Sequence, residues 1–400
     1  MRKVVVSLLA VLLLSSCDDG LNKYDLNRPV GWAACASASA DPYDLSGGRG
    51  GTKIVLKASG GDDGLLIRNA LEHYDIVVLD GSAGEFIFDR TREIDSLSSK
   101  TIVGINDAVV RSRFNISEEI YSLLADTGSL PTSIGSGGVL SNGQRVVESR
   151  EYAQRQILID AFGDPDEAYR CSGMFRFVAC DNLIVRNIAF IGPGAVDLGG
   201  DPLLRLVSSQ HVWIDHCSFT DGIKCNICMS YDTDFVDVTW TVFQYSDKVV
   251  NHNYCCLMGS SDNNPNIGAL KVTFANDIWG NNIRARVPMC RLGTVHILNN
   301  LYSCVGTRGI NPRKDSRFLI EGTYFETGVK PFCTYGHKLH MPEAYNWKDC
   351  FFEDEYVPED YGTVTIPYKY RPMTAEIVPE VLRSASGAGP TLRNPLKISR

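Results

Sequence analysis

Three arginines lie within the nine residues "IRARVPMCR" at positions 283–291. Arg284 and Arg286 are two positions apart, so on an extended backbone their side chains point to the same side. Pro288 lacks a backbone N–H, which fits a loop or the end of a strand better than a central strand. Two interpretations are open: a solvated strand edge protected by charge, or a site that binds an anion.

Composition limits the partners that this positive segment can have. The chain has 400 residues, of which 44% are hydrophobic and 22% charged, as in a globular protein with an ample core. Its formal net charge is −8, so we expect no nucleic-acid partner. An acidic ligand would not be attracted over long range either, and any anion site must be local.

The N-terminus has the layout of a targeting segment. A basic start precedes the apolar run "VVVSLLAVLLL", which is short for a membrane span but typical of a secretory signal. The following "LLSSC", ending at Cys17, resembles the lipobox of bacterial lipoproteins, in which the cysteine is lipidated. We therefore expect a lipoprotein signal peptide over 1–16, a polar tether over 17–28 and a folded domain over 29–400. An ordinary cleaved signal peptide is the alternative.

This interpretation predicts an exported protein. Its only attachment to a membrane would be the N-terminal lipid, on the periplasmic side or at the cell surface. Twelve of the 13 cysteines follow Cys17, and several stand where an apolar residue would serve, which favours small core residues. Cys225-x-x-Cys228 with the adjacent Cys255 and Cys256 also offers four thiolates to zinc, although the adjacent pair makes a tetrahedral site awkward.

A repeat in the second half of the chain indicates the architecture. Six segments place apolar residues at their first and third positions and an aromatic residue at the eighth. The aromatic residues are separated by 29, 24, 36, 23 and 23 positions, which indicates a solenoid with insertions. A β-propeller needs longer repeats of about 40 to 45 residues. We therefore predict an all-β, single-stranded parallel β-helix with long loop insertions, whose stacked aromatic residues are Phe190, Phe219, Phe243, Trp279, Tyr302 and Phe325.

Other segments fit around these coils. The stretch "LLIRNALEHY" predicts an amphipathic helix, and the polar, glycine-rich residues near 113–170 predict a long excursion from the solenoid. The tail "TAEIVPEVLRSASGAG" predicts a short helix and turn that pack back along the coils. No boundary indicates a second folded domain.

The order of four motifs resembles the pectate lyase superfamily and, more closely, the bacterial family 1 polysaccharide lyases. They are "WIDH" at 213–216, "DK" at 247–248, "GSSD" at 259–262 and R-x-P-x-x-R-x-G-x-x-H-x-x-N-N at 286–300. The likeness covers roughly residues 30 to 390. It implies a right-handed parallel β-helix that cleaves α-1,4-galacturonan, as pectate or pectin, by β-elimination and leaves 4,5-unsaturated uronate ends. We expect a monomer.

The resemblance also implies roles for the positive residues. Arg286 would be the base that takes the proton next to the uronate carboxyl group, and Lys248 and Arg291 would bind substrate carboxylates. The resulting carbanion needs positive charge close by, which favours the anion-binding interpretation of the arginine-rich segment. A guanidinium is normally always protonated. Neighbouring cations and desolvation would lower its pKa in the direction that a base needs.

The calcium site of the family is altered. Pectate lyases use Ca²⁺ to bridge enzyme and substrate carboxylates, and Asp201 in "GGDPL" matches one ligand position. The other two carboxylates lie in a D-G-N-x-D segment, where this chain has Lys224 and Cys228. Calcium takes six to eight oxygen ligands and a lysine repels it. The resemblance therefore implies Ca²⁺, whereas these two substitutions disfavour it.

Three interpretations of this change are open. Lys224 replaces the metal and neutralises a uronate carboxylate directly, as a basic side chain does in the pectin lyase branch. Alternatively, Asp221 and Asp232 rebuild a displaced metal site. In the third, the protein is a catalytically weakened or inactive pectin-binding lipoprotein of a glycan-capture system. A glycoside hydrolase on the same fold would need paired carboxylates, whereas these coils offer arginine, lysine and cysteine.

We expect two histidines and two asparagines to stabilise the fold and to take no part in catalysis. The alternation that buries Val212 and Ile214 directs His216 of "WIDH" to the same face, so we expect a hydrogen-bonded structural role, and the same for His296. Asn299 and Asn300 would continue a ladder of stacked asparagines at the corners of the coils.

Overall fold

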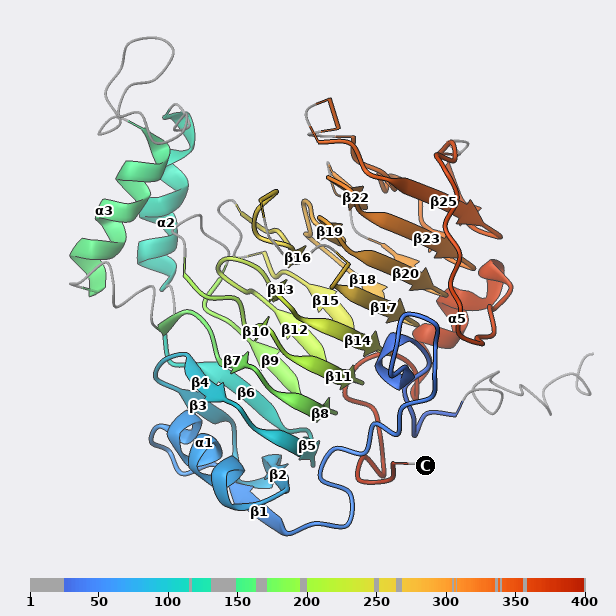
Figure 1. Cartoon of the computed structure of the whole chain (residues 1–400). Helices are drawn as coiled ribbons and strands as arrows, with labels where there is room; N and C mark the ends of the chain where they lie inside the picture. Colours follow the sequence, from blue (N-terminus) through green and yellow to red (C-terminus); the bar gives the residue numbers. More distant parts are fainter. Residues whose placement is uncertain are drawn as a thin grey trace, which may run out of the picture.

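A computed structural model of the chain describes residues 25–114, 117–130, 149–162, 171–194, 200–247, 252–263, 268–303, 306, 308–334, 337–338, 340–354 and 358–398. The described chain winds into stacked coils whose strands form three parallel sheets (Figure 1). Every pairing between named strands is parallel, and each sheet takes one strand from successive coils. The predicted all-β parallel β-helix is therefore confirmed, and the sheet pairing excludes a propeller.

The first sheet has ten strands. In spatial order they are β1 (Lys53–Lys57), β2 (Ile76–Asp80), β5 (Ser98–Ile105), β8 (Asp181–Arg186), β11 (Gln210–Asp215), β14 (Asp234–Thr239), β17 (Lys271–Ala275), β20 (Thr294–Leu298), β23 (Arg317–Glu321) and β25 (Ala344–Lys348). The second sheet has nine: β3 (Phe86–Phe88), β6 (Val109–Ser112), β9 (Ala189–Ile191), β12 (Ser218–Thr220), β15 (Val242–Gln244), β18 (Ile278–Trp279), β21 (Leu301–Tyr302), β24 (Tyr324–Phe325) and β26 (Phe351–Phe352).

The third sheet has seven strands and is the one that the arginine-rich segment enters. Its strands are β4 (Arg92–Asp95), β7 (Phe175–Val178), β10 (Leu204–Val207), β13 (Ile227–Ser230), β16 (Cys256–Met258), β19 (Met289–Cys290) and β22 (Asn311–Pro312). Single-turn 3-10 helices are η2 (Trp32–Ala34), η3 (Gly81–Ala83), η4 (Thr127–Ser129) and η7 (Ala375–Ile377).

The aromatic residues of the repeat form a continuous stack inside the second sheet. Parallel pairing sets each ring beside the ring of the next coil, with centroid distances of 4.8, 5.6, 4.7, 5.7 and 4.7 Å from Phe190 to Phe325. All six rings are buried, as predicted. Stacked aromatic pairs contribute about 0.5–1.5 kcal/mol each beyond the burial of their area, so this ladder fixes the register of the coils.

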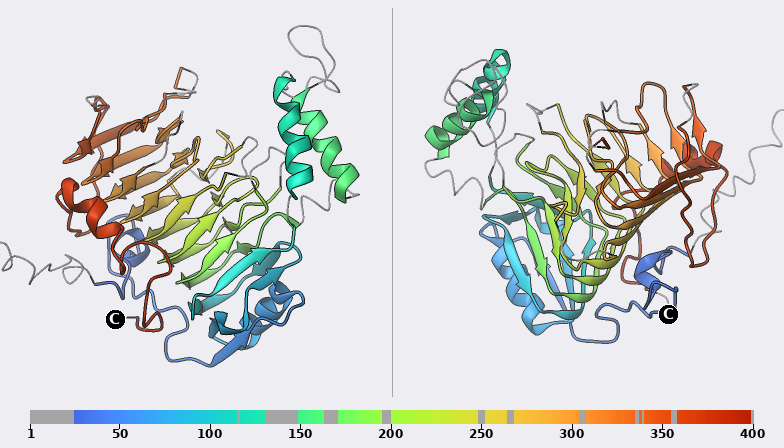
Figure 2. Two further views of the ribbon diagram at one scale, coloured as in Figure 1. Left: turned by 180° about the vertical axis from the view of Figure 1, so that it is seen from behind. Right: turned by 45° about the horizontal axis from the view of Figure 1, so that its top comes forward.

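Helices occur only at the edges of the described coils. α1 (Asp63–His73) matches the predicted amphipathic helix, and α5 (Val378–Leu382) of the tail packs with Trp240 and Leu301, also as predicted. The predicted excursion contains α2 (Glu118–Asp126) and α3 (Arg150–Phe162), which were not expected as helices. Figures 1 and 2 show α2 and α3 side by side, projecting away from the coil stack.

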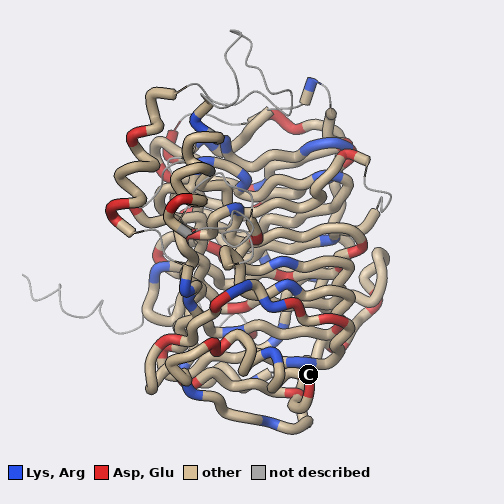
Figure 3. Tube along the Cα trace, turned by 90° about the vertical axis from the view of Figure 1, so that its left-hand side faces the viewer, with Lys and Arg blue, Asp and Glu red and all other residues tan. Residues whose placement is uncertain are grey.

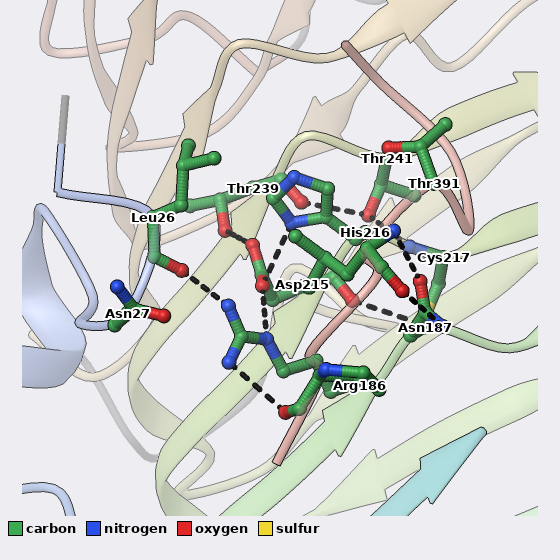
Figure 4. Close-up of polar contacts among 12 residues, drawn as sticks. Leu26, Asn27, Arg186, Asn187, Asp215, His216, Cys217, Thr239, Thr241 and Thr391 are labelled. Carbon is green, nitrogen blue, oxygen red and sulfur yellow. Dashed lines mark hydrogen bonds and ion pairs between the residues drawn. The ribbon is translucent and has the colours of Figure 1, made fainter. Parts of the chain in front are cut away.

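Both ends of the described chain are tied to the coils by one buried guanidinium (Figure 4). Arg186 at the end of β8 donates to Asp215 Oδ2 at 2.7 Å and to the backbone oxygens of Pro395 and Lys397 at 3.1 and 2.7 Å. It also donates to the backbone oxygen of Leu26. In the part of the chain that is described, no helix is long and apolar enough to cross a membrane.

Candidate active site

One row of side chains runs across the coils on the outer face of the seven-stranded sheet. Its neighbours along each strand, such as Leu204, Ile227 and Met258, are buried in the core, so strand alternation turns the row outward. The strand register places one member on each successive coil. We call this the outward row; its members are Arg176, Arg205, Cys228, Leu257 and Met289.

Arg286 lies just before β19, beside this row. Its Nη1 donates to Cys225 Sγ at 3.4 Å, and its Cζ lies 4.7 Å from the ring centroid of Tyr254. The backbone has a φ of 61°, a left-handed conformation that is uncommon outside glycine. Arg284 is exposed whereas Arg286 is half-buried, so the extended geometry assumed from their spacing does not hold. The guanidinium of the predicted base is thus held between a thiol and an aromatic face.

The electrostatic environment of Arg286 differs from the one that we expected. Burial acts to lower its pKa, but the negative charge of Cys225 and the hydrogen bond to it act in the opposite direction and raise the pKa overall. Cys225 changes in the complementary sense: burial opposes its ionisation, but the Cys228 hydrogen bond and the charges of Arg286 and His252 lower its pKa to about 6. The expectation of a lowered arginine pKa is therefore wrong, because the neighbouring group is a thiolate.

Arg291 lies at the other end of β19. Its Nε is 2.6 Å from Asp262 Oδ1, and its Nη1 donates to the backbone oxygen of Gly259 at 2.9 Å, both in the "GSSD" loop. His340 Nδ1 lies 3.2 Å from the second oxygen of Asp262. Burial, then Arg313 and later Arg286, lower the pKa of Arg291. The two predicted arginines therefore flank one strand and influence each other electrostatically.

Arg313 and His340 were not among the predicted site residues. Arg313 follows β22 as Arg291 follows β19, because Cys290 pairs with Pro312 in the parallel register. The sequence held a signal for Arg313. Successive aromatic residues in this part of the repeat are 23 positions apart, and Arg313 follows Arg291 by 22 positions, which is close to one coil. Acidic and basic residues are interspersed along the stacked coils (Figure 3), so this concentration of arginines is local.

The predicted calcium position is occupied by an internal ion pair. Asp201 is buried, and its Oδ1 lies 3.2 Å from Arg205 Nη2. The other two positions hold the half-buried Lys224 and the buried thiol of Cys228. A calcium ion here would have one carboxylate, already paired with a guanidinium, while the other two ligand positions offer a lysine and a cysteine instead of carboxylates. These residues do not fit Ca²⁺.

The other two metal proposals are not assembled either. Asp221 precedes β13, where its Oδ1 accepts from the backbone N–H of Ser246 at 2.8 Å, whereas Asp232 is exposed beyond the far end of that strand. Among the described residues, no three histidine, cysteine or acidic side chains are grouped as metal ligands, so the zinc alternative gains no support.

Two predicted residues lie outside the described residues: Lys248 and Cys17. The adjoining Asp247 is described, and its Oδ1 accepts from Asn282 Nδ2 at 3.1 Å, in the turn that leads to Arg286. Its backbone oxygen accepts from Tyr121 Oη of α2 at 3.0 Å. The role predicted for Lys248 stays a prediction. The adjoining Asp247 contacts Asn282, four residues before Arg286.

The "WIDH" motif lies away from this site, in the ten-stranded sheet. His216 is buried with Nδ1 2.8 Å from Asp215 Oδ2, and His296 is buried with Nδ1 2.7 Å from Tyr368 Oη (Figure 4 shows His216). Asn299 Nδ2 donates to Asn276 Oδ1 of the previous coil at 3.2 Å. Both histidines are buried beside polar partners, in line with the structural roles predicted for them. The asparagine ladder is confirmed for Asn299 alone, because Asn300 bonds the backbone of Phe274 and Asp277 instead of another asparagine.

Comparison with known proteins identifies the family. The sequence model described as "Pectate lyase" matches residues 127–391. The chain belongs to the pectate lyase family. A pectate trisaccharide-lyase of Thermotoga sp. (strain RQ2) is 28% identical over 303 residues, which are 75% of this chain and 64% of that protein. Pectate lyase B of Dickeya chrysanthemi is 28% identical over 286 residues, 64% of this chain and 73% of that protein.

Solved structures of pectate lyases share the fold of this family member. A Paenibacillus sp. 0602 pectate lyase has a TM-score of 0.62 at 12% identity, covering 92% of this chain and 96% of the other. The pectate lyase of Bacillus sp. N165 in complex with trigalacturonate has a TM-score of 0.58 at 15% identity, covering 90% and 98%. The resemblance seen in the sequence motifs is confirmed. The chain spans about 64% of the length of the Thermotoga relatives that it matches.

Proposed function

We propose that this pectate lyase family member is a polysaccharide lyase that cleaves α-1,4-galacturonan by β-elimination and leaves 4,5-unsaturated uronate ends. The observation that carries the proposal is the pair Arg286 and Arg291, which flank β19 in the sheet that also presents Arg176 and Arg205. Relatives named pectate trisaccharide-lyase and pectate lyase support the substrate class, as does the related fold in complex with trigalacturonate.

The chemistry assigns a task to each end of β19. Arg286, at the start, takes the proton on the carbon next to the uronate carboxyl group as the bond to the C4 oxygen breaks. Negative charge develops on that carbon and its carboxylate, and fixed cations stabilise it without reorganising. Arg291, with Arg313 on the next coil, would bind a substrate carboxylate at the other end. Lys248 would bind a further carboxylate.

We further propose that basic side chains replace the calcium ion of the family. Arg205 already neutralises Asp201 at 3.2 Å, and Lys224 stands where the family has a carboxylate. A polyuronate would then meet cations directly rather than through a metal bridge. The alternative, a pectin-binding protein without activity, shares this surface and differs only in whether product forms.

Product formation should therefore survive removal of calcium. With polygalacturonate and with methyl-esterified pectin, we expect activity in excess EDTA to stay within about twofold of the activity with added Ca²⁺, because the residues at Asp201, Lys224 and Cys228 do not fit the ion. The measurement is absorbance of the unsaturated product, with a calcium-dependent pectate lyase in parallel.

The matched variant is Lys224→Ala, which should reduce kcat/KM about tenfold or more, since a hydrogen bond to a charged group contributes about 1.5–3 kcal/mol. Lys57→Ala, at an exposed and distant position, is the control. Activity abolished by EDTA would refute the replacement of calcium. Binding to either polymer without product would favour the binding protein.

We also propose export as a lipoprotein anchored through Cys17, supported by the apolar run and "LLSSC" at the N-terminus. Cells fed an alkyne fatty acid should label the wild-type protein, whereas Cys17→Ser should show no label and leave the membrane fraction. Cys35→Ser, a cysteine in the described domain, is the control and should label normally. A labelled Cys17→Ser protein would contradict the anchor. The monomeric state stays a prediction.

A further inference from the structure

A large cavity lies away from the arginine site, between the two terminal segments of the described chain. Its volume is about 1010 Å³, at the upper end of the range of about 300–1,000 Å³ that is usual for ligand pockets. Residues from 25–45 line one wall, residues 367–371 line the other, and the buried Asn276, Leu298 and Asn299 lie at its base. We call this cavity the terminal groove. Figures 1 and 2 show both terminal segments beside the ten-stranded sheet, away from α2 and α3.

Both walls of the terminal groove are fixed to the same strands. On the N-terminal wall, the Gly31 N–H donates to Asp237 Oδ2 of β14 at 2.7 Å, and the Trp32 N–H donates to Thr273 Oγ1 of β17 at 3.0 Å. On the C-terminal wall, Tyr368 Oη lies 2.8 Å from the same Thr273 oxygen. The rings of Trp32 and Tyr368 meet edge to face at 5.2 Å. The groove is therefore preformed, and a ligand would order little of the chain on binding.

The charges that line the terminal groove leave an excess of cations. Its two carboxylates, those of Asp25 and Asp44, are each paired with an arginine. By contrast, the exposed side chains of Lys369 and Arg371 have no ion-pair partner among the described residues. In a chain with a formal net charge of −8, two unpaired cations on one wall attract anions locally.

The base of the terminal groove offers a hydrogen-bond donor. Asn276 is only 2% exposed, and its Oδ1 accepts from Asn299 Nδ2 at 3.2 Å. The described residues supply no partner for its own Nδ2, which is therefore free to donate to a ligand. Tyr43 and Tyr370 line the two walls as half-buried aromatic residues. A donor at the base, aromatic rings on the walls and cations at the rim suit a sugar chain that carries carboxylates.

We propose that the terminal groove is a second, non-catalytic binding site for an acidic oligosaccharide of the galacturonate type. Its carboxylates lie against Lys369 and Arg371, and a hydroxyl oxygen accepts from Asn276 Nδ2. The identity of the sugar rests on the proposed lyase function, whereas the shape and charge of the groove do not. The groove borders β14 and β17 of the ten-stranded sheet, and the arginine site borders β19 of the seven-stranded sheet. A long polymer can therefore engage both sites, which retains it near the enzyme.

The test compares a polymer with a short substrate. In the double variant Lys369→Ala/Arg371→Ala, we expect the KM for polygalacturonate to rise about three- to tenfold, as two exposed charge pairs are lost. Its kcat should stay within about twofold, and so should kcat/KM for the galacturonate tetramer, because a short chain engages one site at a time. Retardation in a native gel that contains polygalacturonate and EDTA measures binding directly, and the double variant should be retarded less than the wild type.

Lys53→Ala/Lys57→Ala is the matched control, since it removes two exposed cations from β1 and changes the net charge equally. It should keep the wild-type KM and retardation. Equal losses in both double variants would reveal a general charge effect and overturn the inference. An unchanged KM and retardation in Lys369→Ala/Arg371→Ala would overturn it too. A wild type that forms no product, yet is retarded through Lys369 and Arg371, would defeat the lyase function and retain the groove.

Discussion

Arg286→Lys should lower kcat/KM on polygalacturonate by about 10³-fold or more while leaving the fold intact. The guanidinium has two terminal nitrogens, and Nη1 is already hydrogen-bonded to Cys225 at 3.4 Å, which leaves Nη2 for the substrate. A lysine has one terminal nitrogen and cannot occupy both positions. It also loses the planar contact with Tyr254. The measurement is the rate of unsaturated product formation at saturating and at low substrate.

Arg284→Lys is the control for this variant. Arg284 lies two residues away in the same segment but is exposed, and its variant should stay within about threefold of the wild type. Thermal unfolding of both proteins should match the wild type. An Arg286→Lys enzyme with more than a tenth of the wild-type activity would show that this guanidinium is not the group that contacts the reacting carbon.

The periodic part of the fold was predictable because one physical requirement repeats on every coil. Each coil must bury an aromatic ring against the ring of the coil below, so Phe243 and Trp279 hold equivalent positions even though 36 residues separate them. Insertions between them loop outward and leave the register unchanged. The helices between residues 113 and 170 were harder to predict from the sequence. Ser117 was one local signal for the start of α2, because its hydroxyl accepts from the Ile120 N–H as a helix cap.

Some of the site residues could be predicted from the sequence, but the groups that surround them could not. Arg286 and Arg291 followed from motif order, whereas Arg205 could be recognised as the partner of Asp201 only from their contact at 3.2 Å. Cys225 stands in a loop, where no periodicity assigns an orientation, and nothing in the sequence places its thiol against Arg286. Loop residues from different coils meet only after the stack has formed, so the sign of the arginine pKa shift was beyond sequence reasoning.

The largest stability effect is expected at the buried ion pair that ties the chain ends to the coils. Arg186→Met should reduce the free energy of unfolding by about 3–5 kcal/mol, because it leaves the fully buried Asp215 carboxylate without its guanidinium. Three backbone oxygens, those of Leu26, Pro395 and Lys397, lose the same donor. The measurement is denaturant unfolding at pH 7, followed by tryptophan fluorescence.

The pH dependence follows from the shift at Asp215. Burial opposes its ionisation, but the charges of His216 and Arg186 outweigh burial and lower its pKa in the folded protein. The pair therefore stabilises the fold above the unfolded pKa of about 3.9 and loses that contribution as the pH falls through the folded pKa. The difference between wild type and Arg186→Met should be largest near pH 7 and should shrink in acid.

Two further variants separate the buried pair from a general loss of charge. Arg111→Met removes an exposed partner of Glu85 and should cost at most about 1 kcal/mol. Arg186→Met combined with Asp215→Asn should recover part of the loss, because the isolated buried charge is then gone. If Arg186→Met instead unfolds like Arg111→Met, the chain ends are held by their apolar contacts, and the guanidinium that joins them to β8 and β11 contributes little to the fold.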